Sequence, residues 1–252
     1  MRDYPLIDTN FIKRSFGFVF HNFFYLLSVY ALFLVPVVIA DKLFWNNTGV
    51  IDWVIKKFSL RTFHLIDDTI LCLLILIFIF TSASLFKAID ARTRKSNIPA
   101  WEIIKQEWKQ FPAYLVFLIV LAGKVLLWAL LLVIPGCAYA LYYSCAPVIF
   151  LTEHPDINVS LRKSRELIKA NIKTYTHNFI FMHVLLLASV FPVYQIGVSL
   201  SFQLTSIQEV VNADQYIWYF LAVYLSSLVI LTHVLYYNLY KELLTLPQPK
   251  TT

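Results

Sequence analysis

The stretches AYLVFLIVLAGKVLLWALLLVI (113–134) and CAYALYYSCAPVIFLT (137–152), joined by Pro135-Gly136, decide the fold of this chain. About 20 consecutive apolar residues are needed for a helix to cross a bilayer. Pro-Gly is a strong turn signal. We therefore predict two membrane helices that form a tight hairpin. Because 137–152 is short, a re-entrant segment is the alternative.

Four further apolar stretches lie on either side of this pair: 22–40, 69–86, 179–200 and 217–238. Hydrophobic residues make up 59% of the chain and charged residues 14%, whereas roughly a quarter of the residues in a soluble domain are charged. The sequence predicts an all-α integral membrane protein, a six-helix transmembrane bundle in one polytopic domain over 1–252. The first stretch begins too late for a signal peptide and follows Asp3 and Asp8, which favours a retained anchor.

The basic residues indicate which ends of the spans face the cytoplasm. Sixteen Lys and Arg residues lie in the N-terminal segment, in 87–111, in 153–178 and in the C-terminal tail, and four lie in 41–68. Cytoplasmic connections carry such an excess, so we expect both termini in the cytoplasm, although Lys56-Lys57 runs against the rule. The net charge of +6 then comes from basic residues that contact anionic lipid headgroups. Without a nucleic-acid-binding motif, no nucleic-acid partner is expected.

Two connections on the predicted cytoplasmic side have helical periodicity. In 100–111 an apolar stripe is formed by Trp101, Ile104, Trp108 and Phe111. In 158–175, with Asn158 as the expected N-cap, one face carries Leu161, Ile168, Ile172 and Tyr175. Basic residues line its flank, namely Arg162, Arg165, Lys169 and Lys173. We expect amphipathic helices in the membrane interface, with these basic groups on lipid headgroups; packing on the end of the bundle is the alternative.

A weak internal repeat accompanies these segments. The entries to three spans read His21-Asn22-Phe23, Lys109-Gln110-Phe111 and His177-Asn178-Phe179. Each follows a cytoplasmic segment and precedes a pair of spans. This suggests a three-fold helix-plus-hairpin pseudo-repeat.

Three ionisable residues within the spans are candidates for function. Lys124 lies at the middle of 113–134, where a charge is costly and often marks a functional site. Lys124 could be neutral, could hydrogen-bond carbonyls freed by Pro135, Pro147 or Pro192, or could line a wet cavity. The alternative is a tolerated lysine that snorkels or faces a lipid-filled groove. His183 and His233 could relay protons, but structural hydrogen bonding is favoured because no span core holds an acidic residue.

The sequence predicts no catalytic, cofactor-binding or metal site, since it lacks a nucleophile motif, a phosphate loop and paired carboxylates. Its three cysteines are Cys72, Cys137 and Cys145, all within apolar stretches. This is neither a disulfide framework nor a zinc pattern. We expect three free thiols.

One group of motifs supports a family resemblance. In chain order it comprises Ile134-Pro135-Gly136, Tyr142-Tyr143-Ser144-Cys145-Ala146-Pro147, Glu153, a basic helix with Leu161, Lys163-Ser164 and Leu167, and a last span ending in Tyr236-Tyr237 and Tyr240. This pattern resembles the YciC-like bacterial inner-membrane proteins and the membrane domain of some glycerophosphodiester phosphodiesterases. The sharp part covers 134–168, and the chain has fewer Gly residues than usual for the family. The resemblance implies a bacterial cytoplasmic membrane protein and carries over no catalytic residues.

Three functions follow as hypotheses. The preferred one is a non-enzymatic inner-membrane protein that acts through membrane lipids or other envelope proteins, in an oligomeric state that the sequence leaves open. The second is a small-molecule or lipid transporter with a cavity around Lys124. An intramembrane enzyme is the third, and it would need an acid, base or metal cluster.

Overall fold

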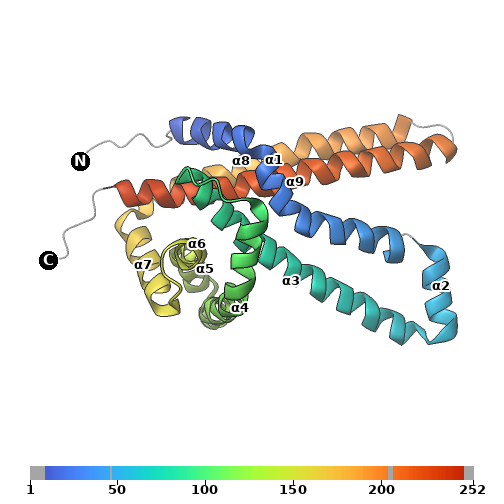
Figure 1. Ribbon diagram of the computed structural model, residues 1–252, viewed down its shortest axis with the longest axis horizontal. Coiled ribbons are helices and arrows are strands. Elements are labelled where there is room, and N and C mark those ends of the chain that lie inside the picture. The colour runs from blue at the N-terminus through green and yellow to red at the C-terminus, as the bar shows by residue number, and fades with distance from the viewer. Residues whose placement is uncertain (1–8, 46, 204–206, 247–252) are drawn as a thin grey trace. The chain divides into compact units, whose positions relative to one another are not determined.

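The computed structural model describes the backbone of residues 9–45, 47–203 and 207–246, and within these the side chains of 11–40, 42–44, 47–130, 132–188 and 224–246. Over these residues the chain is helical and has no strands, which confirms the predicted all-α class (Figure 1). The helices are α1 (Thr9–Ala40), the π-helix η1 (Asp41–Trp45), α2 (Thr48–Lys57), α3 (Leu60–Thr93), α4 (Ala100–Leu131), α5 (Val133–Tyr143), α6 (Ala146–Thr152), α7 (Ile157–Ala170), α8 (Ile172–Gln203) and α9 (Ile207–Thr245).

Four segments of the described chain have the length and apolar character needed to cross a membrane: Phe11–Phe44, Leu60–Thr93, Ala100–Leu130 and Val133–Thr152. They include the predicted stretches 22–40 and 69–86 and most of the hairpin. The other two stretches, 179–200 and 217–238, lie within α8 and α9, but the side chains of 189–200 and 217–223 lie outside the described residues. The six-span count and the pseudo-repeat therefore remain predictions.

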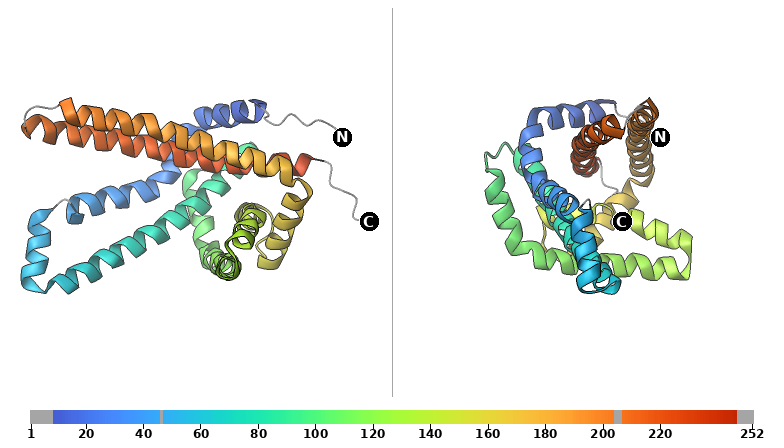
Figure 2. Two further views of the ribbon diagram at one scale, coloured as in Figure 1. Left: turned by 180° about the vertical axis from the view of Figure 1, so that it is seen from behind. Right: turned by 90° about the vertical axis from the view of Figure 1, so that its right-hand side faces the viewer.

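The chain divides into two compact units. One consists of Phe24–Lys109, and the other combines Met1–Phe23 with Gln110–Thr252. The boundaries fall inside α1 and inside α4, where Pro112 follows closely. Below, the first is called the 24–109 unit and the second the 110–252 unit. Within the latter, the long helices α8 and α9 run side by side (Figure 2).

The 24–109 unit contains a helical connection where the sequence showed only a segment between spans. Asn47 caps α2 by accepting a hydrogen bond from the Val50 N–H at 3.1 Å, and Ser59 caps α3 by accepting one from the Thr62 N–H at 3.2 Å. Such caps satisfy amide groups that a helix start leaves free. The short helix α2 packs on α3.

The end of α3 is closed by a Schellman motif. The Ser96 N–H donates to the Ala91 carbonyl at 2.9 Å, and the Lys95 N–H donates to the Arg92 carbonyl at 3.1 Å. This places Lys95 in the left-handed region, with φ 56°. Glycine is the usual residue there because it has no Cβ to clash.

The turn of the predicted hairpin lies three residues earlier than expected. Pro135 and Gly136 belong to the first turn of α5, and the break falls at Leu132, which is extended. Proline fits a first helical turn because its missing N–H would lack a partner there anyway. Gly136 serves a different purpose: a Cβ on it would lie 2.6 Å from the Ala129 Cα of α4. The glycine therefore permits close approach of two helices, and it does not form the turn.

Two further sequence predictions need correction. The N-cap of α7 is Asp156, whose carboxylate accepts a hydrogen bond from the Val159 N–H at 2.8 Å, and Asn158 lies inside the helix. The segment 100–111 is the start of the continuous helix α4 and not a separate helix. Its predicted apolar stripe is largely open, with Trp101 and Trp108 exposed, while Ile103 and Glu107 are buried.

Candidate functional site

Helix α7 separates a buried face from a charged face. Its buried residues are Ser160, Leu161, Ser164, Leu167 and Ile168. These pack toward α5, α6, α8 and α9, all within the 110–252 unit. The predicted headgroup residues Arg162, Arg165 and Lys169 on α7, and Lys173 at the start of α8, are all exposed. The apolar face is thus occupied by protein, as in the packing alternative, and the basic face is exposed.

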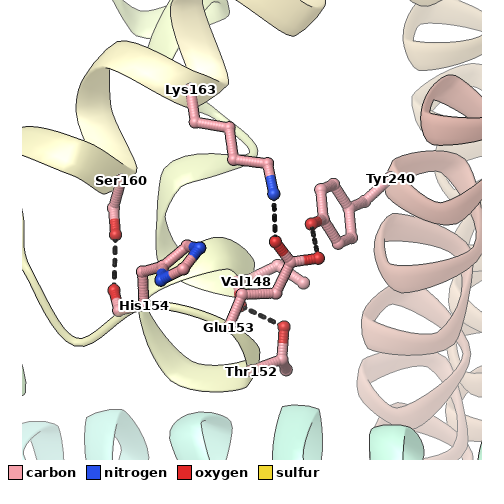
Figure 3. A network of polar contacts seen from close by, with 7 residues as sticks. All are labelled: Val148, Thr152, Glu153, His154, Ser160, Lys163 and Tyr240. Carbon is pink, nitrogen blue, oxygen red and sulfur yellow. Dashed lines mark hydrogen bonds and ion pairs between the residues drawn. The ribbon is translucent and has the colours of Figure 1, made fainter.

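A carboxylate at the end of α6 joins three helices. Glu153 accepts hydrogen bonds from the Lys163 ammonium of α7 and from the Tyr240 hydroxyl of α9 (Figure 3). The contact with Lys163 is also an ion pair. Charge-assisted hydrogen bonds of this kind are about twice as strong as neutral ones. Glu153 therefore fixes α7 against the C-terminal part of α9.

The ionisation of Glu153 follows from these contacts. Partial burial alone would raise the pKa of Glu153, but the hydrogen bonds from Lys163 and Tyr240 and the charges of Lys163 and Lys241 outweigh it and lower the pKa. The carboxylate is consequently ionised at neutral pH. Its two oxygens are engaged by neighbours on two helices, which suits a structural anchor.

Serine hydroxyls complete the attachment of α7. The Ser164 hydroxyl donates to the Tyr142 carbonyl of α5 at 2.8 Å. The Ser160 hydroxyl donates to the His154 carbonyl, also at 2.8 Å (Figure 3). Ser144, between α5 and α6, is hydrogen-bonded to the hydroxyl of the buried Tyr175. Hydrogen bonds around α5, α6 and α7 thus engage six of the residues quoted above from the sequence pattern: Tyr142, Ser144, Glu153, Lys163, Ser164 and Tyr240.

The two histidines have structural partners. Nδ1 of His183 lies 2.7 Å from the Phe179 carbonyl oxygen, and its Nε2 lies 3.4 Å from the Tyr236 hydroxyl. Nδ1 of His233 lies 2.7 Å from the Val229 carbonyl oxygen. Each ring thus contacts the carbonyl one turn earlier in its own helix. Within the described residues, no group of three His, Cys, Asp or Glu side chains is arranged to hold a metal ion.

Lys124 is exposed on the surface of the 110–252 unit, together with Ala122 and Gly123. No atom outside the local helix lies within 4 Å of the position of a Gly123 Cβ. The surface beside Lys124 is therefore open. A pocket of about 200 Å³ elsewhere in α4 is lined by Glu102, Lys105, Gln106 and Lys109, and not by Lys124.

Sequence reasoning missed a buried ion pair in the 24–109 unit. Nζ of Lys87 lies 2.8 Å from a carboxylate oxygen of Glu107, whose side chain is fully buried. In the sequence both residues belong to a polar connection, but they lie on the long helices α3 and α4. Close by in the chain, the Arg92 guanidinium stacks 3.8 Å from the Tyr25 ring centre, and the Tyr25 hydroxyl donates to the Ile98 carbonyl at 3.0 Å. The sequence offered one signal for this pair: opposite charges, Lys87 and Glu107, on two helical segments that follow each other in the chain.

The cysteines agree with the sequence prediction. Cys72, Cys137 and Cys145 are free thiols. Cys72 and Cys137 are exposed, and Cys145 is buried.

Comparison of the chain with models of known protein families, with curated proteins and with solved structures finds no match.

Proposed function

We propose that this chain is a non-enzymatic, polytopic protein of the bacterial cytoplasmic membrane whose α7 surface binds anionic phospholipid headgroups. Four exposed basic side chains on α7 and at the start of α8 carry the proposal: Arg162, Arg165, Lys169 and Lys173. Each basic group near an anionic surface contributes on the order of 1 kcal/mol to membrane attraction. Both termini lie in the cytoplasm in this proposal, which is supported by the basic residues of the connections.

The support beneath this basic surface strengthens the proposal. Lys163 also belongs to α7, but its ammonium group donates a hydrogen bond to Glu153 within the protein. Within the part of the chain that the structure describes, the Lys163–Glu153 contact is the ion pair that α7 makes. The outward basic groups of α7 therefore remain available to a ligand. Helix α7 is held on its far side by packing and by the Ser164 hydrogen bond. A rigid helix loses little conformational freedom when its charged side chains bind a ligand.

The resemblance to the YciC-like family supports the same class of protein. Its motifs, from Ile134 to Leu167 and at Tyr240, include the residues that attach α7 in this chain. The resemblance implies an integral inner-membrane protein of poorly defined role, and it carries over no catalytic residues. A role through lipid contact suits that class.

The proposal can be tested by lipid-dependent thermal stability. Purified protein in a neutral detergent would be heated with added phosphatidylglycerol or phosphatidylcholine. The test variant replaces the four basic residues by Gln, and a matched variant replaces the same number on the predicted outer side, Lys42, Lys56, Lys57 and Arg61. We expect phosphatidylglycerol to raise the Tm of the parent and of the matched variant, and to have little effect on the test variant.

Added salt should reduce the phosphatidylglycerol effect, because exposed charges more than about 10 Å apart are screened at 0.1 M ionic strength. Equal stabilisation of the parent and the test variant, or equal stabilisation by both lipids, would contradict the proposal.

A further inference from the structure

The hairpin of α4 and α5 projects from the 110–252 unit as an almost wholly apolar arm. From Tyr114 to Phe117 its base packs on the unit, and Phe117 stacks on Phe150 of α6 with ring centres 4.6 Å apart. Beyond this base the side chains are open: Leu130 and Ile134 at the tip are each 84% exposed. In the run 113–134, Lys124 is the one charged residue.

This arm requires an apolar surrounding. Exposing one large aliphatic side chain to water costs about 1.5–3 kcal/mol relative to burial. Six such residues are open near the tip: Leu126, Leu127, Leu130, Leu132, Val133 and Ile134. A helix that rests on the membrane surface needs a strongly charged or polar face toward water, and a single lysine does not form such a face. Hydrocarbon is therefore the natural environment of the arm.

The direction of the arm decides how it enters the membrane. Figure 1 looks nearly along α5 and the 110–131 part of α4, while α8 and α9 run across the view. The right-hand view of Figure 2 shows the reverse, with α8 and α9 end-on and the arm extended in the plane of the page. All these segments belong to the 110–252 unit. If α8 and α9 cross the bilayer, the arm runs along it.

The contacts at the base of the arm give its depth. Tyr142 of α5 is bonded to Ser164 of α7, and Glu153 after α6 is bonded to Tyr240 of α9. Tyr240 follows the predicted span 217–238, and α7 carries the basic residues expected at the inner surface. The base of the arm is thus level with the cytoplasmic ends of α8 and α9.

We propose that the α4–α5 hairpin does not cross the membrane but lies within its cytoplasmic leaflet, with its apolar side chains among lipid acyl chains and Lys124 reaching the inner headgroups. This inference rests on the proposed topology of α8 and α9, and not on lipid binding by α7. It gives Lys124 a place beside phosphate groups instead of at mid-membrane. It also leaves both neighbouring connections on one side, as the distribution of basic residues requires.

The backbone at the tip suits this environment. Irregular backbone in hydrocarbon is tolerated only when its polar groups are satisfied. Leu132 serves both helices: its N–H donates to the Trp128 carbonyl at 3.0 Å, and its carbonyl accepts from the Gly136 N–H at 3.2 Å. Pro135 has no N–H to satisfy. The Leu132 and Gly136 N–H groups are thus paired across the break.

Chemical labelling from each side of the membrane tests the proposal. In a background with Cys72→Ser and Cys137→Ser, Leu132→Cys would be treated with a membrane-impermeant maleimide in intact cells, with Asn47→Cys as the external control. The native amine of Lys124 would be treated with an impermeant amine reagent in inside-out vesicles and in intact cells. Lys169 is its internal control, and Lys57 its external control, with peptide mass mapping as the readout.

We expect Lys124 to be modified in inside-out vesicles and not in intact cells, and Leu132→Cys to stay unmodified in intact cells. Modification of Leu132→Cys from outside at the rate of Asn47→Cys would overturn the proposal, because the tip would then reach the outer water. Protection of Lys124 in inside-out vesicles would also overturn it. Modification of Lys169 from outside would instead refute the topology on which the proposal rests.

Discussion

Gly136 offers the sharpest test of the packing in the α4–α5 hairpin. Replacing it by Ala places a Cβ 2.6 Å from the Cα and 2.9 Å from the N of Ala129, both backbone atoms within α4. Real Cβ atoms do not approach so closely, and a helical backbone cannot rotate away as a side chain can. The two helices must therefore separate.

The expected magnitude combines two opposing effects. Overpacking of a close contact costs about 1–3 kcal/mol, while Ala in place of Gly in a helix contributes about 0.8–1.0 kcal/mol of stability. Gly136→Ala should then lower the free energy of unfolding by up to about 2 kcal/mol. Gly123→Ala is the matched control, because nothing lies within 4 Å of its Cβ position. It should raise stability by up to about 1 kcal/mol.

Cys145 provides the assay. It is 2% exposed, so it reacts with a fluorogenic maleimide only when the surrounding unit opens. Cys72→Ser and Cys137→Ser remove the two exposed thiols, and the protein is heated in detergent micelles. About 1 kcal/mol corresponds to a Tm change of roughly 2–4 °C for a chain of this size. A Tm for Gly136→Ala equal to or above that of Gly123→Ala would refute the argument from close helix approach.

Three further predictions concern charged groups. The lowered pKa of Glu153 contributes stability above the ordinary carboxyl pKa of about 4.3, and this is lost as pH falls through the lower folded value; Glu153→Gln should therefore flatten the acid side of a Tm-against-pH curve, and an unchanged slope would contradict the assignment. Glu107→Gln should destabilise the chain by about 3 kcal/mol in thermal unfolding, because it removes the buried carboxylate that faces the half-buried Lys87 ammonium, whereas Lys87→Met with Glu107→Leu should recover most of the loss; equal losses would show that charge pairing is not the cause. Lys95→Gly should raise the Tm by relieving the left-handed backbone, and a lower Tm would show that the Lys95 side chain contributes more than the strain removes.

The helical class and four apolar segments long enough to cross a membrane could be predicted from the sequence, because hydrophobic length is a direct physical requirement of the bilayer. The run 69–86, for example, lies well inside α3. Helix ends are harder to predict, because the same residues serve more than one purpose there. Pro135-Gly136 reads as a turn since both residues disrupt helices, yet proline is also favoured in a first turn, and only the neighbouring Ala129 shows why glycine is needed.

The basic surface of α7 could also be predicted, since helical periodicity places residues of one kind on one face. What covers the opposite face could not, because that depends on contacts with segments distant in the chain. The Glu153–Tyr240 bond joins residues 87 positions apart. Lys87 and Glu107 show the same limit: each looks like an ordinary connection residue until two helices bring them together.

The contacts of α1 have a consequence for the order in which the protein can be completed during synthesis. The hydroxyl of the buried Ser15 accepts a hydrogen bond from Asn238 Nδ2 at 2.9 Å, and Arg14 lies 3.7 Å from Glu242. Ser15 and Asn238 are 223 positions apart in the chain. The start of α1 therefore cannot form this hydrogen bond until nearly the whole chain has left the ribosome. An unfinished chain therefore leaves this helix end without its partner. Release of truncated chains should accordingly make them targets for membrane quality control, even when every earlier helix has inserted.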